Sequence, residues 1–257
     1  MAFTIEQLYS LLLQLWLPLV RILSLLLFCP VLDNPAFSRK AKIMLALLLS
    51  VVLTAQPIVP SPVSDLMSVA MLMLTGEQIL WGWLFGHMLW WVFWVLQTAG
   101  HMLAMSMGLG MSIMHDPANG TPTVAIAQFL NIYAVLLFFV MDGHLLLVTI
   151  LHHSFLWWPI GEAISVSMLE KVSGGVGFII AGALLLALPA LLILLLVQAV
   201  FGLLNRVSPT LNLFSLGFPI SMLFGLFCIG LLSYSLSDHY LKLSYSLLAE
   251  LARLRVR

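Results

Sequence analysis

The sequence predicts an all-α, polytopic membrane protein of roughly five to seven hydrophobic helices. Of its 257 residues, 62% are hydrophobic and 8% are charged, whereas an average soluble domain is about 45–50% apolar and about 25% charged. One chain cannot bury so much apolar surface, so part of it must face lipid or other protein chains. Helices are expected rather than a β-barrel, because the alternation of apolar and polar residues typical of membrane strands is absent.

Five apolar stretches reach the roughly 20 residues that a membrane span needs. They are Leu8–Cys29, Ile79–Met107, Val124–Leu151, Val176–Leu204 and Leu213–Leu236. Two shorter stretches are uncertain spans: Ala41–Ala55 ends at Gln56-Pro57, and Leu66–Leu74 either stands alone or joins the next stretch across Thr75-Gly76-Glu77. Beyond the last stretch, Ser237–Arg257 is expected to form a short amphipathic tail.

The positive charges conflict with a simple count of six spans. Cytoplasmic segments carry an excess of Lys and Arg, so the cluster Arg39, Lys40 and Lys42 and the C-terminal Arg253, Arg255 and Arg257 should both be cytoplasmic. Six spans would place the first cluster on the opposite side. Either one segment is misassigned, or some helices are not independent spans. Arg21, in the middle of the first stretch, should face protein or water, because a cation at the membrane centre costs at least ~2.5 kcal/mol.

No pattern in the sequence supports an enzyme or a nucleic-acid-binding protein. The net charge is +0, so no basic field attracts nucleic acid. The sequence has no GxxxxGK[ST], GxGxxG or GxSxG motif, so we expect no catalytic residues and no cofactor. No HExxH or other close His and carboxylate set appears, so no metal site is expected either. A proton relay through Asp116, Asp142 or Glu77 stays open as an alternative.

Three segments carry more specific motifs. They are Gln97–Gly120 (QTAGHMLAMSMGLGMSIMHDPANG), Asp142-Gly143-His144, and Leu204–Pro219 (LNRVSPTLNLFSLGFP). Together they resemble the FliR family, the R subunits of the flagellar type III protein-export gate, with its SpaR and SctT relatives in virulence injectisomes. The resemblance runs from the first helix to the last. Three positions depart from the family pattern: His101 replaces the usual Glu after Gly, Ser106 a frequent Gln, and Asp142 a common Asn.

The resemblance implies a structural, pore-forming subunit without catalysis. Residues 1–257 would form one FliR-like domain, with a helical hairpin near residues 176–236 resembling the smaller Q subunit. Such proteins assemble with P and Q subunits into a helical pore complex in the bacterial inner membrane, at the flagellar basal body. An FlhB-type switch protein and an FlhA-type ring would be neighbouring partners, with membrane lipid around them. Unfolded flagellar proteins would be the cargo, or virulence effectors if this is an injectisome homologue.

The segment Gly108–Pro122, here called the plug loop, is the main candidate for a functional site. Glycines open backbone conformations that other residues avoid, Asp-Pro favours a turn, and adaptable methionines can seal a constriction yet yield to varied chains. The resemblance implies that this loop enters the pore as a plug. The alternative is an ordinary interhelical loop whose methionines fill gaps. The candidate residues are Met105, Met107, Gly108, Gly110, Met111, Met114, Asp116, Pro117 and Gly120, with Met102 close by.

The Leu204–Pro219 motif is a candidate for subunit docking. Asn205 and Arg206 are expected to cap the end of one helix, where an amide and a cation suit exposed carbonyls. Proline on either side should stop the helices, and glycine should permit close approach. The hairpin corner either docks against a neighbouring subunit or serves only the fold of this chain. The candidate residues are Asn205, Arg206, Pro209, Asn212, Phe214, Gly217 and Pro219.

An independent small-solute transporter is the competing class of function. Such a protein is typically built from inverted repeats around a charged site at the membrane midplane. The sequence shows neither feature.

Overall fold

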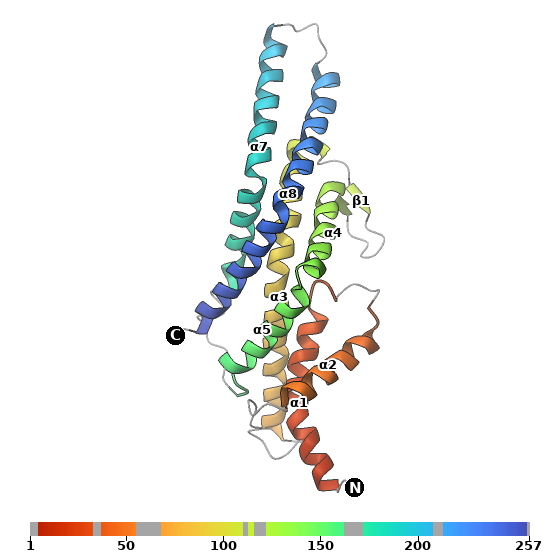
Figure 1. Ribbon diagram of the computed structural model, residues 1–257, viewed down its shortest axis with the longest axis vertical. Coiled ribbons are helices and arrows are strands. Elements are labelled where there is room, and N and C mark those ends of the chain that lie inside the picture. Colours follow the sequence, from red (N-terminus) through yellow and green to blue (C-terminus); the bar gives the residue numbers. More distant parts are fainter. Residues whose placement is uncertain are drawn as a thin grey trace. The chain divides into compact units, whose positions relative to one another are not determined.

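The computed structural model describes residues 5–32, 37–54, 68–109, 113–115, 122–161, 172–207 and 213–255. These residues are mostly helical (Figure 1), which confirms the predicted all-α class. The helices are α1 (Ile5–Leu27), α2 (Arg39–Thr54), α3 (Val69–Ser106), α4 (Ala125–Val140), α5 (Gly143–Trp157), α7 (Gly175–Val207) and α8 (Leu213–Arg255). Two three-residue strands, β1 (Ile113–His115) and β2 (Pro122–Val124), lie between α3 and α4.

Among the described helices, four are long and apolar enough to cross a membrane: α1, α3, α7 and α8. The consecutive pair α4 and α5 adds a fifth candidate if it crosses once. Helix α2 has only 16 residues, which is short of a full span. The sequence-based range of five to seven hydrophobic helices therefore agrees with the structure.

Three predicted boundaries have a clear outcome. The described part of Leu66–Leu74 joins the next stretch, since α3 runs without a break for 38 residues from Val69. The stretch Val124–Leu151 is divided between two helices, because α4 and α5 meet at a break with a 75° bend. The segment beyond Leu236, expected to form a short amphipathic tail, is a continuation of α8, which runs for 43 residues to Arg255. Buried side chains recur along that extension at helical spacing, at Tyr240, Ser244, Leu247 and Leu251, and packing therefore sustains the helix.

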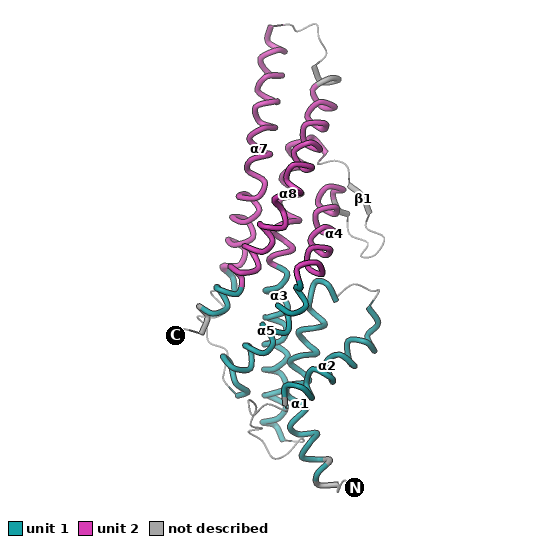
Figure 2. The backbone as a smooth tube through the Cα atoms, in the orientation of Figure 1, with its two compact units in different colours: residues 1–90, 142–173, 248–257 teal, residues 91–141, 174–247 magenta. Residues whose placement is uncertain are grey.

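The chain forms two compact units (Figure 2). Unit 1 comprises residues 1–90, 142–173 and 248–257, and unit 2 comprises residues 91–141 and 174–247. Unit 1 therefore holds α1, α2, α5 and the first part of α3. Unit 2 holds α4, α7, most of α8 and the rest of α3.

In unit 1, α1 packs closely on the first part of α3. Gly82 and Gly86, four residues apart, form a small-xxx-small pattern that lets two membrane helices approach. A Cβ atom on Gly82 would lie 2.6 Å from Cβ of Ser24, and one on Gly86 would lie 3.0 Å from Cβ of Phe28. Nε1 of Trp90 donates a 3.0 Å hydrogen bond to the carbonyl oxygen of Phe28. The glycines thus explain why α1 can bury its polar residues against α3.

In unit 2, α7 and α8 form an antiparallel hairpin. A Cβ atom on Gly217 would lie 4.0 Å from the ring of Phe201, near the turn, and one on Gly182 would lie 3.4 Å from the side chain of Leu243, at the other end. The second part of α3 packs on α4 through another glycine, since a Cβ atom on Gly100 would lie 2.6 Å from Cα of Ala127.

The hairpin leaves most of its apolar surface uncovered. Only 28% of the most apolar window of α7 and 33% of that of α8 is buried, against 67% for α3. The large apolar side chains exposed on α7 include Val176, Ile180, Leu184, Leu185, Leu188, Leu192, Leu195, Leu196, Val200 and Leu203. Lipid or further protein chains must cover this surface, because water would make its exposure unfavourable.

Candidate functional site

Arg21 is the polar centre of unit 1. Its side chain is fully buried, which confirms the prediction that it faces protein rather than lipid. Its Nε donates a 2.6 Å hydrogen bond to Oε1 of Gln78. One terminal nitrogen donates to the carbonyl oxygens of Ser154 at 3.0 Å and Trp158 at 2.9 Å.

These two carbonyls belong to the C-terminal end of α5, where a helix carries unpaired acceptors and partial negative charge. The guanidinium therefore caps α5 from a different helix. Its central carbon also lies 4.5 Å from the ring centroid of Phe155 and 5.9 Å from that of Trp81, distances at which an aromatic face attracts a cation. A charge inside an apolar stretch of α1 is thus stabilised by protein groups from two other helices, α3 and α5.

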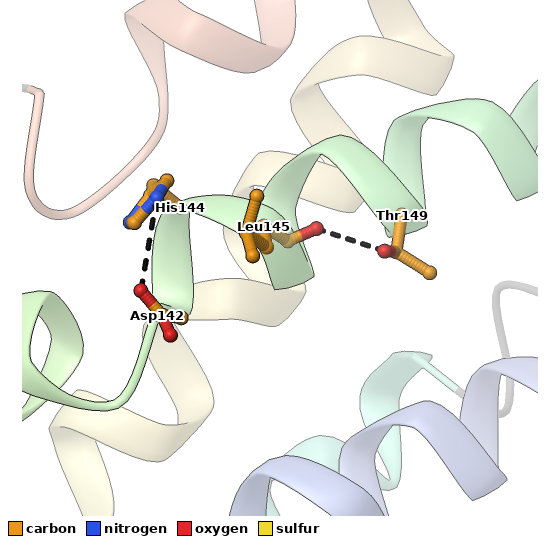
Figure 3. Close-up of polar contacts among 4 residues, drawn as sticks. All are labelled: Asp142, His144, Leu145 and Thr149. Atoms are coloured by element: carbon orange, nitrogen blue, oxygen red, sulfur yellow. Dashed lines mark hydrogen bonds and ion pairs between the residues drawn. The ribbon is translucent and has the colours of Figure 1, made fainter.

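Asp142 sets the break between α4 and α5. Its φ of 54° and ψ of 34° are left-handed, a conformation that ends a helix and that Asp and Asn adopt more readily than most residues. Its carboxylate lies 3.9 Å from Nε2 of His144, and the Thr149 hydroxyl donates to the carbonyl oxygen of Leu145 at 2.8 Å (Figure 3). The side chains of Asp142 and His144 are 70% and 57% exposed, so the pair itself contributes little to stability.

The residues predicted for the plug loop fall into three groups. Met105 is 68% exposed at the end of α3, whereas Met107 is completely buried. Met114 lies in β1, whose backbone pairs with Thr123 of β2. Gly110, Met111, Asp116, Pro117 and Gly120 lie outside the described residues.

The short strands add order that the sequence did not predict. β1 and β2 are antiparallel, with Ile113 opposite Val124 and His115 opposite Pro122. In the sequence, Asp116, Pro117 and Gly120 come between the two strands. The paired strands β1 and β2 thus connect the second half of the plug loop directly to the start of α4.

The turn that leads from α3 into the plug loop, Ser106, Met107 and Gly108, is here called the loop root, and it contacts both helices of the α7–α8 hairpin. Nε2 of Gln198 in α7 donates a 2.7 Å hydrogen bond to the carbonyl oxygen of Ser106. The Met107 side chain fills the space beside Gly225 of α8, where a Cβ atom would lie 2.6 Å from Cε of Met107. Gly108 has a φ of 79°, which favours glycine.

The docking candidates lie at the turn of the hairpin. Asn205 and Arg206 are exposed in the last turn of α7, while Pro209 and Asn212 lie outside the described residues. Phe214 lies in the first turn of α8. The prediction that Pro219 stops a helix is wrong, since Pro219 lies inside α8. It comes only six residues after the start of α8 at Leu213, so few backbone bonds precede it.

A groove of about 430 Å³ opens between α7 and α8 near this turn. It is lined by Gln198, Phe201, Gly202, Asn205, Gly217, Phe218 and Ser221. Two of the docking candidates, Asn205 and Gly217, thus share one concave surface with Gln198.

Gln198 and Gln78 were missed as functional candidates. Gln198 is the one amide in the run LLILLLVQAV (residues 191–200), whereas Gln78 directly follows Thr75, Gly76 and Glu77. A lone polar side chain in a membrane helix usually faces a partner, because lipid offers it none. That signal could have selected Gln198, although not its partner.

Comparison with known proteins assigns this chain to a family. The family model described as "Bacterial export proteins, family 1" matches residues 12–246. The chain belongs to this family. The flagellar biosynthetic protein FliR of Pectobacterium carotovorum subsp. carotovorum is 37% identical over 221 residues, 85% of this chain and 84% of that protein. FliR of Escherichia coli (strain K12) is 30% identical over 252 residues, 96% of each chain.

The chain is also similar to proteins that are named for other systems. The surface presentation of antigens protein SpaR of Salmonella typhimurium is 29% identical over 229 residues, 88% of this chain and 85% of that protein. This member of the bacterial export proteins is thus similar over most of its length to both kinds of relative, and its identity to the two FliR proteins is the higher.

Proposed function

We propose that this bacterial export protein is a structural, pore-forming subunit of a flagellar type III export gate. The observation that carries the proposal is the 37% identity over 84% of a protein named flagellar biosynthetic protein FliR. The match covers 85% of this chain and 84% of that protein, so the similarity is not confined to one segment. The proposed role is to line the export channel and to close it at rest, without catalysis by this chain.

The uncovered faces of α7 and α8 support a role inside an assembly. With 28% and 33% of their apolar windows buried, these helices need more cover than their own unit supplies. The P and Q subunits of the gate are the proposed cover, with lipid on the remainder. The helical hairpin of α7 and α8, near the predicted residues 176–236, is the part proposed to resemble a Q subunit. An FlhB-type switch protein and an FlhA-type ring are the proposed neighbours.

The positive charges support an inner-membrane location with both clusters in the cytoplasm. The candidate crossings between Arg39 and the C-terminus are α3, the α4–α5 pair, α7 and α8. An even number of crossings returns the chain to the same side, so both clusters can obey the positive-inside rule. This arrangement removes the conflict that a separate α2 span creates.

The plug loop is the proposed closure of the channel. Met107 at its root is fully buried while Met105 is 68% exposed, so methionines both anchor the loop and remain available to line a constriction. The flexible thioether side chains can give way to chains of different sequence.

Deleting the gene and restoring it on a plasmid tests the assignment. We expect the deletion strain to lose flagellar filaments and swimming, and to recover both with the wild-type gene. Loss of an injectisome needle with normal swimming would instead assign the chain to virulence secretion. Normal flagella and normal secretion together would refute the proposal.

A further inference from the structure

Helix α2 carries three cations and no acidic residue. Arg39 and Lys40 are exposed in its first turn, and Lys42 follows two residues later. Among the described residues, none of these three cations takes part in an ion pair. Acidic residues are the ones that stabilise the start of a helix, because that end already carries partial positive charge. The start of α2 is therefore strongly positive, and no described group of this chain neutralises it.

The remaining surface of α2 is apolar and largely uncovered. The helix packs on α1 within unit 1 (Figure 1). Its buried side chains form a single stripe at helical spacing, namely Lys42, Ala46, Ser50 and Leu53. Large apolar side chains are exposed on the other faces, namely Ile43, Met44, Leu45, Leu47, Leu48, Val51 and Val52. Water would make this exposure unfavourable, so other molecules must cover the helix on several sides.

The order of charge and apolar surface along α2 matches a phospholipid molecule. The cations end at residue 42, and the exposed apolar side chains begin at residue 43. A phosphate group beside the cations therefore places its acyl chains beside the apolar side chains. A docked protein helix would cover only one face, whereas lipid surrounds a helix on every free face. At about 24 Å, the 16 residues of α2 also suit a helix that enters the hydrocarbon core without crossing its roughly 30 Å.

We propose that α2 is a lipid-binding helix that selects anionic phospholipids. Arg39 and Lys40 hold the phosphate group, and the apolar side chains that follow contact the acyl chains. Each cation near an anionic membrane surface strengthens binding about fivefold, and the planar guanidinium can donate two hydrogen bonds to one phosphate. The bound lipid fixes the depth of unit 1 in the bilayer. The proposal goes beyond the proposed function, because it holds equally for a flagellar and for an injectisome subunit.

A fluorescent label on α2 reports which lipid lies beside the helix. Met44→Cys carries the label, because Met44 is 73% exposed and lies one helical turn after Lys40. In this chain Cys29 and Cys228 are alanine. The assembled gate is placed in nanodiscs of phosphatidylcholine with a minor share of phosphatidylglycerol, and only one of the two lipids is brominated, because bromine quenches the label on contact. We expect brominated phosphatidylglycerol to quench more, for its share, than brominated phosphatidylcholine.

Removing the charges should remove this preference. Arg39→Gln combined with Lys40→Gln should lower the preference for phosphatidylglycerol about twenty-fivefold, a factor of five for each cation. Arg39→Lys combined with Lys40→Arg keeps both charges and is the matched control, which should retain the preference. Lys242→Gln removes an exposed lysine of α8 and should have no effect. High salt should weaken the preference of the wild type, because it screens exposed charges.

Two results would overturn the proposal. Quenching by both lipids in proportion to their shares would mean that lipid covers α2 without selection by charge. A label that neither lipid quenches would mean that another protein chain covers the helix. If the double variant lowers the amount of complex, the salt series on the wild type decides, and a preference that high salt leaves unchanged would contradict the role of the cations. None of these results bears on the flagellar assignment, which gene deletion tests.

Discussion

Nε of Arg21 in α1 donates a 2.6 Å hydrogen bond to Oε1 of Gln78 in α3, and both side chains are fully buried. The same guanidinium also holds the C-terminal carbonyls of α5 at Ser154 and Trp158. One side chain thus joins three helices of unit 1 that are far apart in the sequence. The proposed export subunit places a charge where lipid would reject it and pairs that charge with three protein acceptors.

Replacing Arg21 with methionine should destabilise unit 1 strongly. The substitution leaves the Gln78 oxygen and two carbonyls of α5 buried without a donor, which costs about 3–5 kcal/mol. We expect a clear fall in the melting temperature of the detergent-solubilised gate. The melting temperature of the Arg21→Lys variant should lie between those of the wild type and of Arg21→Met, because an ammonium group lacks the planar arrangement of donors. Arg39→Met, at an exposed position, is the control, and an equal loss there would contradict the assignment.

Gly82→Ala should weaken the contact between α1 and α3. The added Cβ atom would lie 2.6 Å from Cβ of Ser24, and overpacking of this kind costs about 1–3 kcal/mol. Gly76→Ala in the same helix meets nothing within 4 Å and should be neutral or stabilising by up to about 1 kcal/mol. Thermal unfolding of the two purified variants measures the difference, and identical melting temperatures would show that the helices do not depend on this approach.

Asp142→Asn should be nearly neutral, whereas Asp142→Ala should cost about 1–2 kcal/mol. Asn accepts the left-handed backbone with a φ of 54°, and alanine does so poorly. His144→Ala should change little, because it removes only a 3.9 Å contact between exposed side chains. Swimming assays and thermal unfolding should rank the variants in this order. A larger defect in His144→Ala than in Asp142→Ala would indicate that the charge pair, and not the backbone, matters.

Arg206→Glu should reduce co-purification of the other gate subunits if the hairpin corner is a docking surface. The residue is exposed in the last turn of α7, so its loss costs this helix only about 0.3–1 kcal/mol. Affinity purification with quantification of the P and Q subunits measures the effect. A complex of normal composition would mean that the Leu204–Pro219 motif serves only the fold of this chain.

The sequence predicted the long helices well, because apolar stretches of sufficient length have few alternatives in a membrane. It failed where one residue changes the backbone. The break at Asp142 lies inside an apolar stretch, and the dipeptide Asp142-Gly143 was the available turn signal. Pro219 gave the opposite error. It was predicted to stop a helix but lies inside α8, because a proline near the start of a helix interrupts few of its backbone hydrogen bonds.

The contacts of the candidate site were beyond the sequence. The burial of Arg21 followed from the cost of a charge in lipid, but its acceptors at Ser154 and Trp158 come from 133 and 137 residues further along the chain. The glycines near the plug loop were expected to serve the turn, as Gly108 does. That Gly225 and Gln198 hold the loop root depends on the hairpin geometry, which no local pattern encodes.

Ion conductance of the purified, assembled gate in lipid bilayers tests the central claim most directly. The wild-type complex should be closed to small ions, and the complex in which this chain lacks Gly110–Ala118 should conduct. If the shortened complex has the same composition as the wild type and stays closed, this chain does not plug the export channel.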